Sequence, residues 1–221
     1  MLRLEELNLQ NLKVYQDDEL YTFTSDAILL SKFTKVKKGD VVADYCAGSG
    51  IVGFNLLGLN SEKIKSLTAF ELQKPLYDLC VKSIEYNGLK EKVNAENIRL
   101  QDLPKEYHGK FSLIVCNPPY AKVGSGETDK IETIAICRSE LKLTLLELVT
   151  AINKGLKYGG RVCLVHRADR LAEVTYELQK QGIEPKTLQL VSSNGKEPYL
   201  FMLEAVKGGK TGLKILKNAK N

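Results

Sequence analysis

The chain has 221 residues, of which 43% are hydrophobic and 27% charged, with a net charge of +5. This length fits one domain, because a single core stops growing efficiently at roughly 250 residues, and the composition excludes a disordered or fibrous chain. No apolar run approaches the roughly 20 residues of a membrane helix, and residues 1–6 lack the basic and apolar regions of a secretory signal. We therefore expect a cytoplasmic protein.

Metal and disulfide chemistry have little to draw on in this sequence. The five cysteines show no CxxC pairing and lie mostly among apolar neighbours, as reduced interior thiols do. With only two histidines, His108 and His166, a zinc site or a histidine-centred triad has very little to draw on. We expect both to be ordinary surface or strand-end residues, and we expect no bound metal.

In chain order, an amphipathic opening segment comes first, in which Ser25 precedes an apolar helix face as a cap does. From residue 41, β-rich apolar runs alternate with segments of helical spacing, which is typical of an α/β domain with a mostly parallel sheet. The last two strands adjoin without a helix and predict an antiparallel hairpin at the sheet edge, turning at residues 193–196. The expected strands cover 41–45, 66–71, 93–98, 111–116, 161–166, 187–191 and 198–206, and the expected helices cover 50–59, 74–86, 138–156 and 169–181. We expect one domain, in which residues 1–36 form a lid, 37–206 the core and 207–221 a basic tail, with a mobile loop at 121–133.

The first strand of this core runs into a turn with two glycines, Gly48 and Gly50. In an open α/β sheet the ligand crevice lies at the carboxyl ends of the strands, where small residues let the backbone approach a nucleotide-like ligand closely. The second strand ends at Glu71, whose carboxylate could accept both ribose hydroxyl protons. After the third strand, Asp102 could recognise an adenine amino group while Leu103 covers the ring.

The turn by itself leaves other ligands open. The residues Gly48, Gly50 and Gly53 match the dinucleotide fingerprint G-x-G-x-x-G, so a nicotinamide dinucleotide is not excluded at this point. A tight turn without any ligand is a further alternative, and the acids at the ends of the next two strands count against it.

The fourth strand runs directly into the tetrapeptide Asn117-Pro118-Pro119-Tyr120. Two consecutive prolines restrict the backbone, since each fixes its own φ and biases the residue before it. The Asn117 side-chain oxygen and the Pro118 carbonyl could then accept hydrogen bonds from one planar amino group, with Tyr120 stacked on its ring. Two acceptors favour pyramidalisation of such a nitrogen and stabilise the charge that develops during methylation, so the reaction needs no strong base.

The two motifs together resemble the class I, Rossmann-like S-adenosylmethionine-dependent methyltransferases, and the tetrapeptide resembles their amino-methylating branch. Within that branch, almost the whole chain is similar to the bacterial tRNA adenine-N6 methyltransferases that modify adenosine 37 of valine tRNA. The similarity rests on residues 21–30, on the tetrapeptide, on Arg138-Ser139-Glu140 and on the Lys-Gly-Gly-Lys word at 207–210. Cys46 departs from this pattern, because it replaces the usual first glycine, and we expect it to be tolerated because Cys is small.

The resemblance implies a seven-stranded, mostly parallel sheet with helices on both faces, S-adenosylmethionine as cofactor, S-adenosylhomocysteine as product, and tRNA as partner of a monomeric enzyme. The lysine-rich end, with Lys207, Lys210 and Lys214, would attract phosphates, and a solvated, frayed tail is its alternative. The residues and the resemblance together give donor contacts at Thr24, Asp26, Asp44, Cys46, Gly48, Gly50, Glu71, Leu72, Gln101, Asp102, Leu103 and Asn117, a catalytic group of Asn117, Pro118, Pro119 and Tyr120, and RNA contacts at Tyr120, Arg138, Lys207, Lys210 and Lys214.

Two other functions stay open on the sequence. One keeps the enzyme but changes the substrate to guanine N2 of ribosomal RNA or to a protein glutamine, although the usual extra helical domain or duplicated domain of those enzymes is not evident. The other is a non-catalytic module that binds RNA or senses S-adenosylmethionine.

Overall fold

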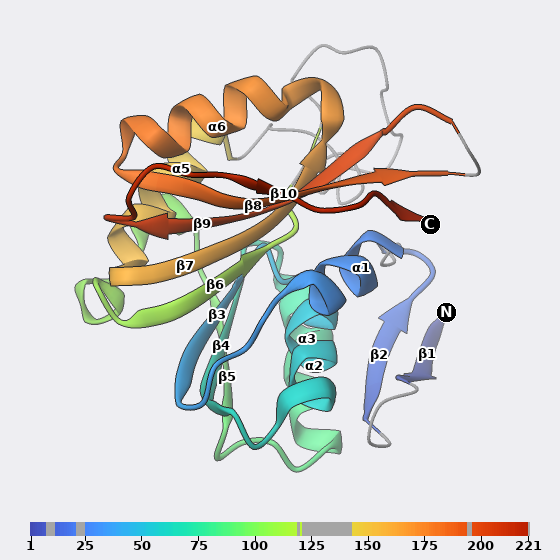
Figure 1. The fold of residues 1–221 in the computed structure, drawn as a ribbon. Helices are drawn as coiled ribbons and strands as arrows, with labels where there is room; N and C mark the ends of the chain where they lie inside the picture. The colour runs from blue at the N-terminus through green and yellow to red at the C-terminus, as the bar shows by residue number, and fades with distance from the viewer. Residues whose placement is uncertain (8–11, 21–24, 119, 121–142, 194–195, 221) are drawn as a thin grey trace.

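The computed structural model describes residues 1–7, 12–20, 25–118, 120, 143–193 and 196–220. Its centre is a sheet with the strand order β10-β8-β9-β7-β6-β3-β4-β5, in which β11 also pairs with β8 (Figure 1). Every pairing in this sheet is parallel except those of β9, which runs antiparallel to β7 on one side and to β8 on the other. The strands are β3 (Asp40–Tyr45), β4 (Ile64–Glu71), β5 (Val93–Asn97), β6 (Phe111–Cys116), β7 (Leu156–Arg167), β8 (Ile183–Ser192), β9 (Leu200–Lys207), β10 (Lys214–Ile215) and β11 (Ala219–Lys220).

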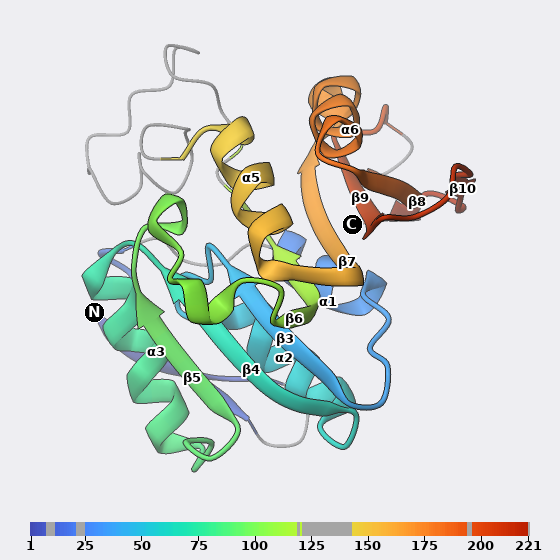
Figure 2. The same ribbon diagram turned by 90° about the vertical axis from the view of Figure 1, so that its left-hand side faces the viewer.

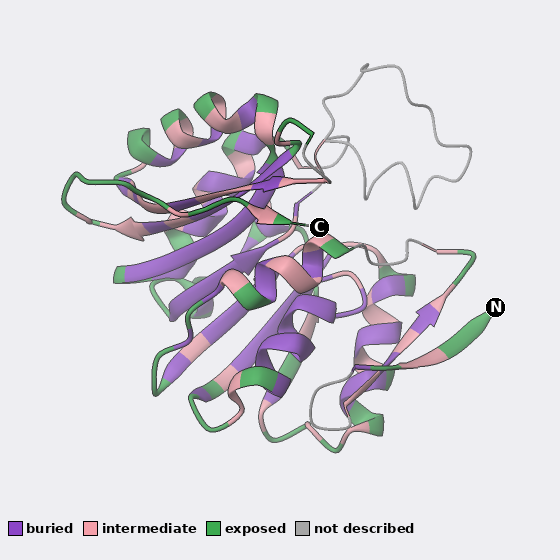
Figure 3. Cartoon of the chain, turned by 45° about the vertical axis from the view of Figure 1, so that its right-hand side comes forward, coloured by how far each residue is buried: buried purple, intermediate pink, exposed green. Residues whose placement is uncertain are grey.

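Helices cover both faces of the sheet because the strands are apolar on both sides. Alternate residues of β3 separate into two hydrophobic clusters, since Val42 packs with the helices on one face and Ala43 with those on the other. The first face carries α1 (Ser25–Phe33), α2 (Ile51–Asn60) and α3 (Lys74–Tyr86), and the second carries α5 (Leu145–Gly155) and α6 (Leu171–Lys180) (Figures 1 and 2). Exposed residues lie on the outer sides of these helices and in the connecting loops (Figure 3). This arrangement confirms the α/β class and the C-terminal antiparallel hairpin.

The predicted elements recur with two corrections. The predicted helix at 138–156 begins at Leu145 in the described residues, because Thr144 and Glu147 form a capping box that starts it there. The opening segment also contains strands, β1 (Leu2–Glu6) and β2 (Lys13–Asp17), which form a separate antiparallel pair. The predicted loop at 121–133 lies outside the described residues.

The C-terminal segment is part of the sheet and is not a frayed tail. Lys214 pairs with Thr187 in the middle of β8, and Lys220 pairs with Ser192 at its carboxyl end. The segment therefore follows the edge strand toward the carboxyl ends of the parallel strands, and it adds two short strands to the seven that were expected.

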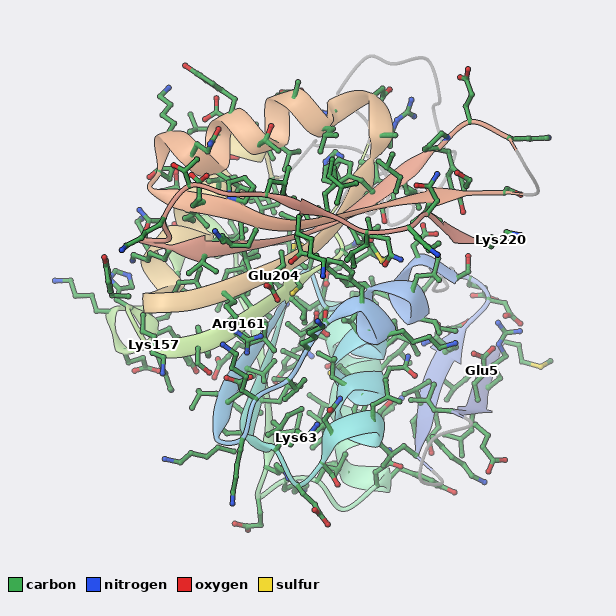
Figure 4. The ribbon with its side chains drawn as sticks, viewed as in Figure 1. Glu5, Lys63, Lys157, Arg161, Glu204 and Lys220 are labelled. Carbon is green, nitrogen blue, oxygen red and sulfur yellow. The ribbon has the colours of Figure 1, made fainter. Side chains whose placement is uncertain are left out.

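A buried ion pair joins three strands at the opposite, amino end of the sheet. Arg161 of β7 lies 2.6 Å from Asp40, and both side chains are 6% exposed. Asp40 also accepts hydrogen bonds from the Ser112 hydroxyl at 2.7 Å and from the Lys37 amide at 2.7 Å. Figure 4 shows Arg161 close to Glu204 of β9, which is 3.9 Å away. Each charge is thus matched by hydrogen bonds as well as by its partner, which is what a buried pair requires.

Replacing Arg161 with Met should lower the free energy of unfolding by about 3–5 kcal/mol, because Asp40 would be left as a buried, uncompensated charge. Urea unfolding of the purified protein measures this change. Arg167→Met is the control, since Arg167 pairs with Asp169 at 2.8 Å but both side chains are more than half exposed, and such pairs contribute about 0–1 kcal/mol. Equal losses in the two variants would show that the buried pair is not a stabilising link.

Candidate active site

The predicted site residues lie at one edge of the sheet, at or after the ends of four neighbouring strands. The order β5-β4-β3-β6 places the carboxyl ends of these parallel strands side by side. The glycine turn follows β3, Glu71 ends β4, Asp102 lies in the 3-10 turn η1 (Leu100–Asp102) after β5, and Asn117 directly follows β6. The topology therefore brings together the two motifs, which are about 70 residues apart in the sequence.

The turn after β3 uses the left-handed region three times. Cys46 has φ 58°, Gly48 has φ 58° and Gly50 has φ 90°. A Cβ added to Gly50 would lie 2.7 Å from the Phe54 ring and 2.9 Å from the Cys80 sulfur, so only glycine fits there. A Cβ on Gly48 would meet nothing within 4 Å, which leaves open space over the turn for a ligand. At Cys46 the constraint is the backbone as much as the size, because a left-handed conformation costs a non-glycine residue about 1–2 kcal/mol.

Asp44 lies beneath this turn without exposed surface. One of its oxygens, Oδ2, accepts a hydrogen bond from the Gly53 amide at 2.8 Å, while Oδ1 has no partner within the described part of the chain. Burial raises the pKa of Asp44 to about 7, the Gly53 amide opposes this shift, and the nearby Glu71 carboxylate adds to it. A buried acceptor without a partner is costly in the free protein, so Asp44 suits a ligand that brings a donor or a positive charge.

Glu71 braces the turn and keeps acceptor capacity. Its Oε2 accepts from the Gly48 amide at 2.8 Å, and its Oε1 accepts from the Gln73 amide at 2.8 Å. Burial raises the pKa of Glu71, and these amides oppose the shift. A carboxylate has about four acceptor positions, and the Leu72 amide also donates to Glu71, so the carboxylate can still accept one ribose hydroxyl.

The other expected donor contacts differ in exposure. Asp102 is exposed and Gln101 and Leu72 are half-buried, whereas Leu103 is 6% exposed and packs in the second hydrophobic cluster, which leaves it little surface to cover a ring. Asp26 is half-buried in the first turn of α1. Thr24 lies outside the described residues.

Asn117 and Tyr120 contact each other directly after β6. The Tyr120 hydroxyl donates a hydrogen bond to the Asn117 side-chain oxygen, and Pro118 is buried beside them. An amide oxygen has two lone pairs, so Asn117 can hold Tyr120 and still accept from an incoming amino group. Pro119 lies outside the described residues.

Two residues that sequence reasoning did not assign to the site support Tyr120 from the end of β7. His166 is 1% exposed, and its ring centroid lies 5.5 Å from that of Tyr120. Burial lowers the pKa of His166 to about 4, so the imidazole is neutral at neutral pH, and its Nδ1 accepts from the Arg167 amide at 2.9 Å. Arg170, which is 7% exposed, donates to the Tyr120 carbonyl at 3.3 Å and pairs with Glu173 at 3.0 Å. His166 therefore lies at a strand end, as expected, and its contact with Tyr120 follows from the adjacency of β6 and β7.

The expected RNA contacts also separate. Lys207 was expected to contact RNA, but its Nζ donates to the carbonyls of Asn153 and Leu156, the latter at 3.0 Å, and so caps the end of α5. Burial lowers the pKa of Lys207, and its side chain makes hydrogen bonds within the protein at the end of α5. Lys210 and Lys214 are exposed. Arg138 lies outside the described residues.

No three potential metal ligands come together among the residues that the structure describes. Within the same residues, no helix is long and apolar enough to cross a membrane.

The family comparison decides between the ligands that the turn left open. The family model described as methyltransferase small domain matches residues 13–179. This chain belongs to the methyltransferase small domain family. The dinucleotide alternative therefore does not hold, and the antiparallel β9 also departs from the all-parallel order of a dinucleotide-binding sheet.

Individual relatives agree with this family. A tRNA1(Val) (adenine(37)-N6)-methyltransferase from Shewanella woodyi is 26% identical over 188 residues, which cover 82% of this chain and 75% of the relative. The crystal structure of a predicted O-methyltransferase from Agrobacterium tumefaciens has a TM-score of 0.68 at 16% identity, over 87% of this chain and 86% of that one. The structure of M. jannaschii TYW2 in complex with AdoMet has a TM-score of 0.64 at 14% identity, over 92% and 84% of the two chains.

For a methyltransferase small domain of this fold, S-adenosylmethionine is the methyl donor. The residues at the turn fit this ligand. Gly48 leaves open space, and Glu71 retains a lone pair for a ribose hydroxyl. The unpartnered Asp44 oxygen favours a positively charged group with N–H hydrogens. The chain is accordingly an enzyme of the methyltransferase class.

Asp44→Asn should stabilise the donor-free protein, and more so at high pH. Because the folded pKa of about 7 lies above the ordinary 3.8, ionisation of Asp44 opposes folding increasingly as the pH rises from about 4 to about 7, and fully above that. At about pH 8 the gain should be of the order of 1–4 kcal/mol, and it should be smallest near pH 4. Urea unfolding at both pH values measures it.

Asp169→Asn serves as the control, because Asp169 is exposed and its pKa is lowered by Arg167. That substitution should bring no gain at either pH. A gain of equal size at both pH values for Asp44→Asn would contradict the ionisation argument.

Proposed function

We propose that this chain transfers the methyl group of S-adenosylmethionine to N6 of an adenine in tRNA, with adenosine 37 of a valine tRNA as the leading substrate. The observation that carries the proposal is the position of Asn117 and Tyr120 at the end of β6, beside the turn that follows β3. The Shewanella woodyi relative is a tRNA1(Val) (adenine(37)-N6)-methyltransferase, which supports an adenine of tRNA as the substrate of this chain.

The chain's own residues account for the reaction at an exocyclic amine. When bound, the donor supplies a methyl group on a positively charged sulfur. The Asn117 oxygen and the Pro118 carbonyl accept from the two amino hydrogens of the base, which favours a pyramidal nitrogen whose lone pair is less delocalised into the ring. Positive charge that develops on this nitrogen is then stabilised by the two acceptors. The methylated nitrogen is acidic enough to lose its proton to water, so the neutral His166 is not required as a base.

Tyr120 is the stacking surface for the target base in this proposal. His166 supports its ring from β7, and Arg170 holds its carbonyl, so the ring is fixed before substrate arrives. An extruded base stacks well on such an aromatic side chain. All of these groups come from one chain, which supports a monomeric enzyme, and we place its activity in the cytoplasm with tRNA.

The lysines at the sheet edge are the proposed RNA surface. We define the C-terminal lysine row as Lys214, Lys217 and Lys220, which are all exposed. The row follows β8 toward its carboxyl end, and Figure 4 shows Lys220 on the opposite side of the molecule from Lys157. Phosphates of a tRNA whose base occupies the site would meet a positive edge there.

The test is transfer of labelled methyl from S-adenosylmethionine to bulk tRNA from a strain that lacks this protein, followed by nucleoside mass spectrometry. N6-methyladenosine is the expected product. Transfer to ribosomal RNA or to a protein glutamine instead would promote the other substrates, and donor binding without transfer to any RNA would indicate a sensing module.

Asn117→Ala should reduce turnover by about 10²–10³-fold, because it removes one of the two acceptors that stabilise the developing charge. Donor affinity should stay within about twofold, since Asn117 acts on the amine. Single-turnover methylation and calorimetric titration with S-adenosylhomocysteine separate these effects. A parallel loss of donor binding and turnover would place Asn117 in the donor site.

Changing the C-terminal lysine row to Gln should lower the slope of log affinity for tRNA against log salt by about 2, because each phosphate contact contributes roughly 0.7–0.9 to this slope. A filter-binding series in increasing salt measures the slope. The matched control replaces Lys63, Lys90 and Lys157, which are also exposed. If the control lowers the slope as much as the row does, the edge is not the RNA surface.

A further inference from the structure

We call the antiparallel pair of β1 and β2 the N-terminal hairpin. Gln16 lies near the end of β2 in this hairpin, and its polar side chain is fully buried. Its amide nitrogen donates to the Ser49 hydroxyl and, at 3.2 Å, to the Tyr15 carbonyl. Its carbonyl oxygen, Oε1, is buried and has no hydrogen-bond partner among the residues that the structure describes. Ser49 lies between Gly48 and Gly50, so Gln16 contacts the turn after β3 although it belongs to a strand outside the central sheet.

The hairpin does not need Gln16 to dock on the domain. The Lys13 amide donates to the Asn87 side chain at 3.0 Å, and the Asn87 amide group donates back to the Lys13 carbonyl at 2.6 Å. The Tyr15 amide donates to the Ser83 hydroxyl at 2.9 Å. These bonds fix β2 against α3, and they leave the burial of an unpartnered oxygen on Gln16 without a structural reason.

Two unpartnered acceptors therefore flank the first turn of α2. Asp44 Oδ1 lies on the strand side, and Gln16 Oε1 lies on the hairpin side through Ser49. A buried acceptor of this kind is stabilised by a ligand N–H or O–H. The carboxylates of Asp44 and Glu71 further favour a ligand group that carries a positive charge as well as N–H hydrogens.

The chemistry of the methyl donor offers three sets of such groups. Its ribose hydroxyls match Glu71 at the end of β4, and its adenine amino group matches the exposed Asp102 after β5. The ammonium of its amino-acid end remains, and it combines three N–H donors with a positive charge.

We propose that Gln16 is a donor-positioning residue, whose side-chain oxygen accepts a hydrogen bond from the ammonium group of S-adenosylmethionine while its amide nitrogen holds Ser49 in the turn. The inference rests on the methyltransferase function only for the identity of the donor. The N-terminal hairpin is thereby part of the donor site.

The experiment compares two ligands that differ at the amino-acid end. Calorimetric titration of the full chain with S-adenosylhomocysteine and with 5′-methylthioadenosine, which lacks that end, is carried out for wild type and Gln16→Met. Met has a similar length without the polar atoms. Affinity for S-adenosylhomocysteine should fall about 10–100-fold, the range for a lost hydrogen bond to a charged group, while affinity for 5′-methylthioadenosine stays within about threefold.

An equal loss for both ligands, or no loss for either, overturns the proposal. Asn87→Leu is the control that weakens hairpin docking without removing the oxygen, and it should change both affinities by the same factor. If Gln16→Met does not fold, Gln16→Asn withdraws the oxygen by one methylene and should change the ratio of the two affinities in the same direction. No RNA is present, so a failure here leaves the tRNA proposal standing, and a failure of tRNA methylation leaves this result intact.

Discussion

The turn after β3 is the constraint on which the rest of the site depends. Three of its five residues, Cys46, Gly48 and Gly50, lie in the left-handed region, and at Cys46, which is not a glycine, such a backbone persists only where its surroundings determine it. Glu71 fixes it from β4 through the Gly48 amide, and Gln16 fixes it from the hairpin through Ser49. The strand order, the N-terminal hairpin and the polar groups beneath the turn therefore all help to fix the backbone of this turn.

The amine site depends on a second set of long-range contacts. Asn117 and Tyr120 hold one another, but the position of Tyr120 is fixed by His166 and Arg170, which come from the end of β7 and the start of α6. The parallel pairing of β6 with β7 brings these residues to the same edge. Because His166 and Arg170 are buried, they hold Tyr120 in place without a ligand, and less ordering has to accompany binding of the proposed base.

The sequence predicted what is encoded locally. The bounds of α3 and β6 agree with the prediction, because periodicity and proline residues mark their ends, and both motifs lie at the carboxyl edge of the sheet, as their positions after strands predicted. The start of α5 was placed too early, since its capping box at Thr144 competes with apolar spacing that continues upstream. Gln16, His166 and Arg170 carry no local signal, because their roles depend on which strand lies next to which. The hydrogen bonds from Lys207 to the end of α5 carry no local signal either, since composition does not show that a lysine caps a distant helix.

Electrostatics divides the carboxyl edge into two regions with opposite requirements. At the turn, Asp44 and Glu71 are both buried, and the Glu71 carboxylate adds to the cost of ionising Asp44, so a positively charged ligand group would relieve a cost that the free protein carries. The lysines of the sheet edge lie outside this buried region, in solvent where salt screens them, and they can attract phosphates without raising the affinity for the product at the turn.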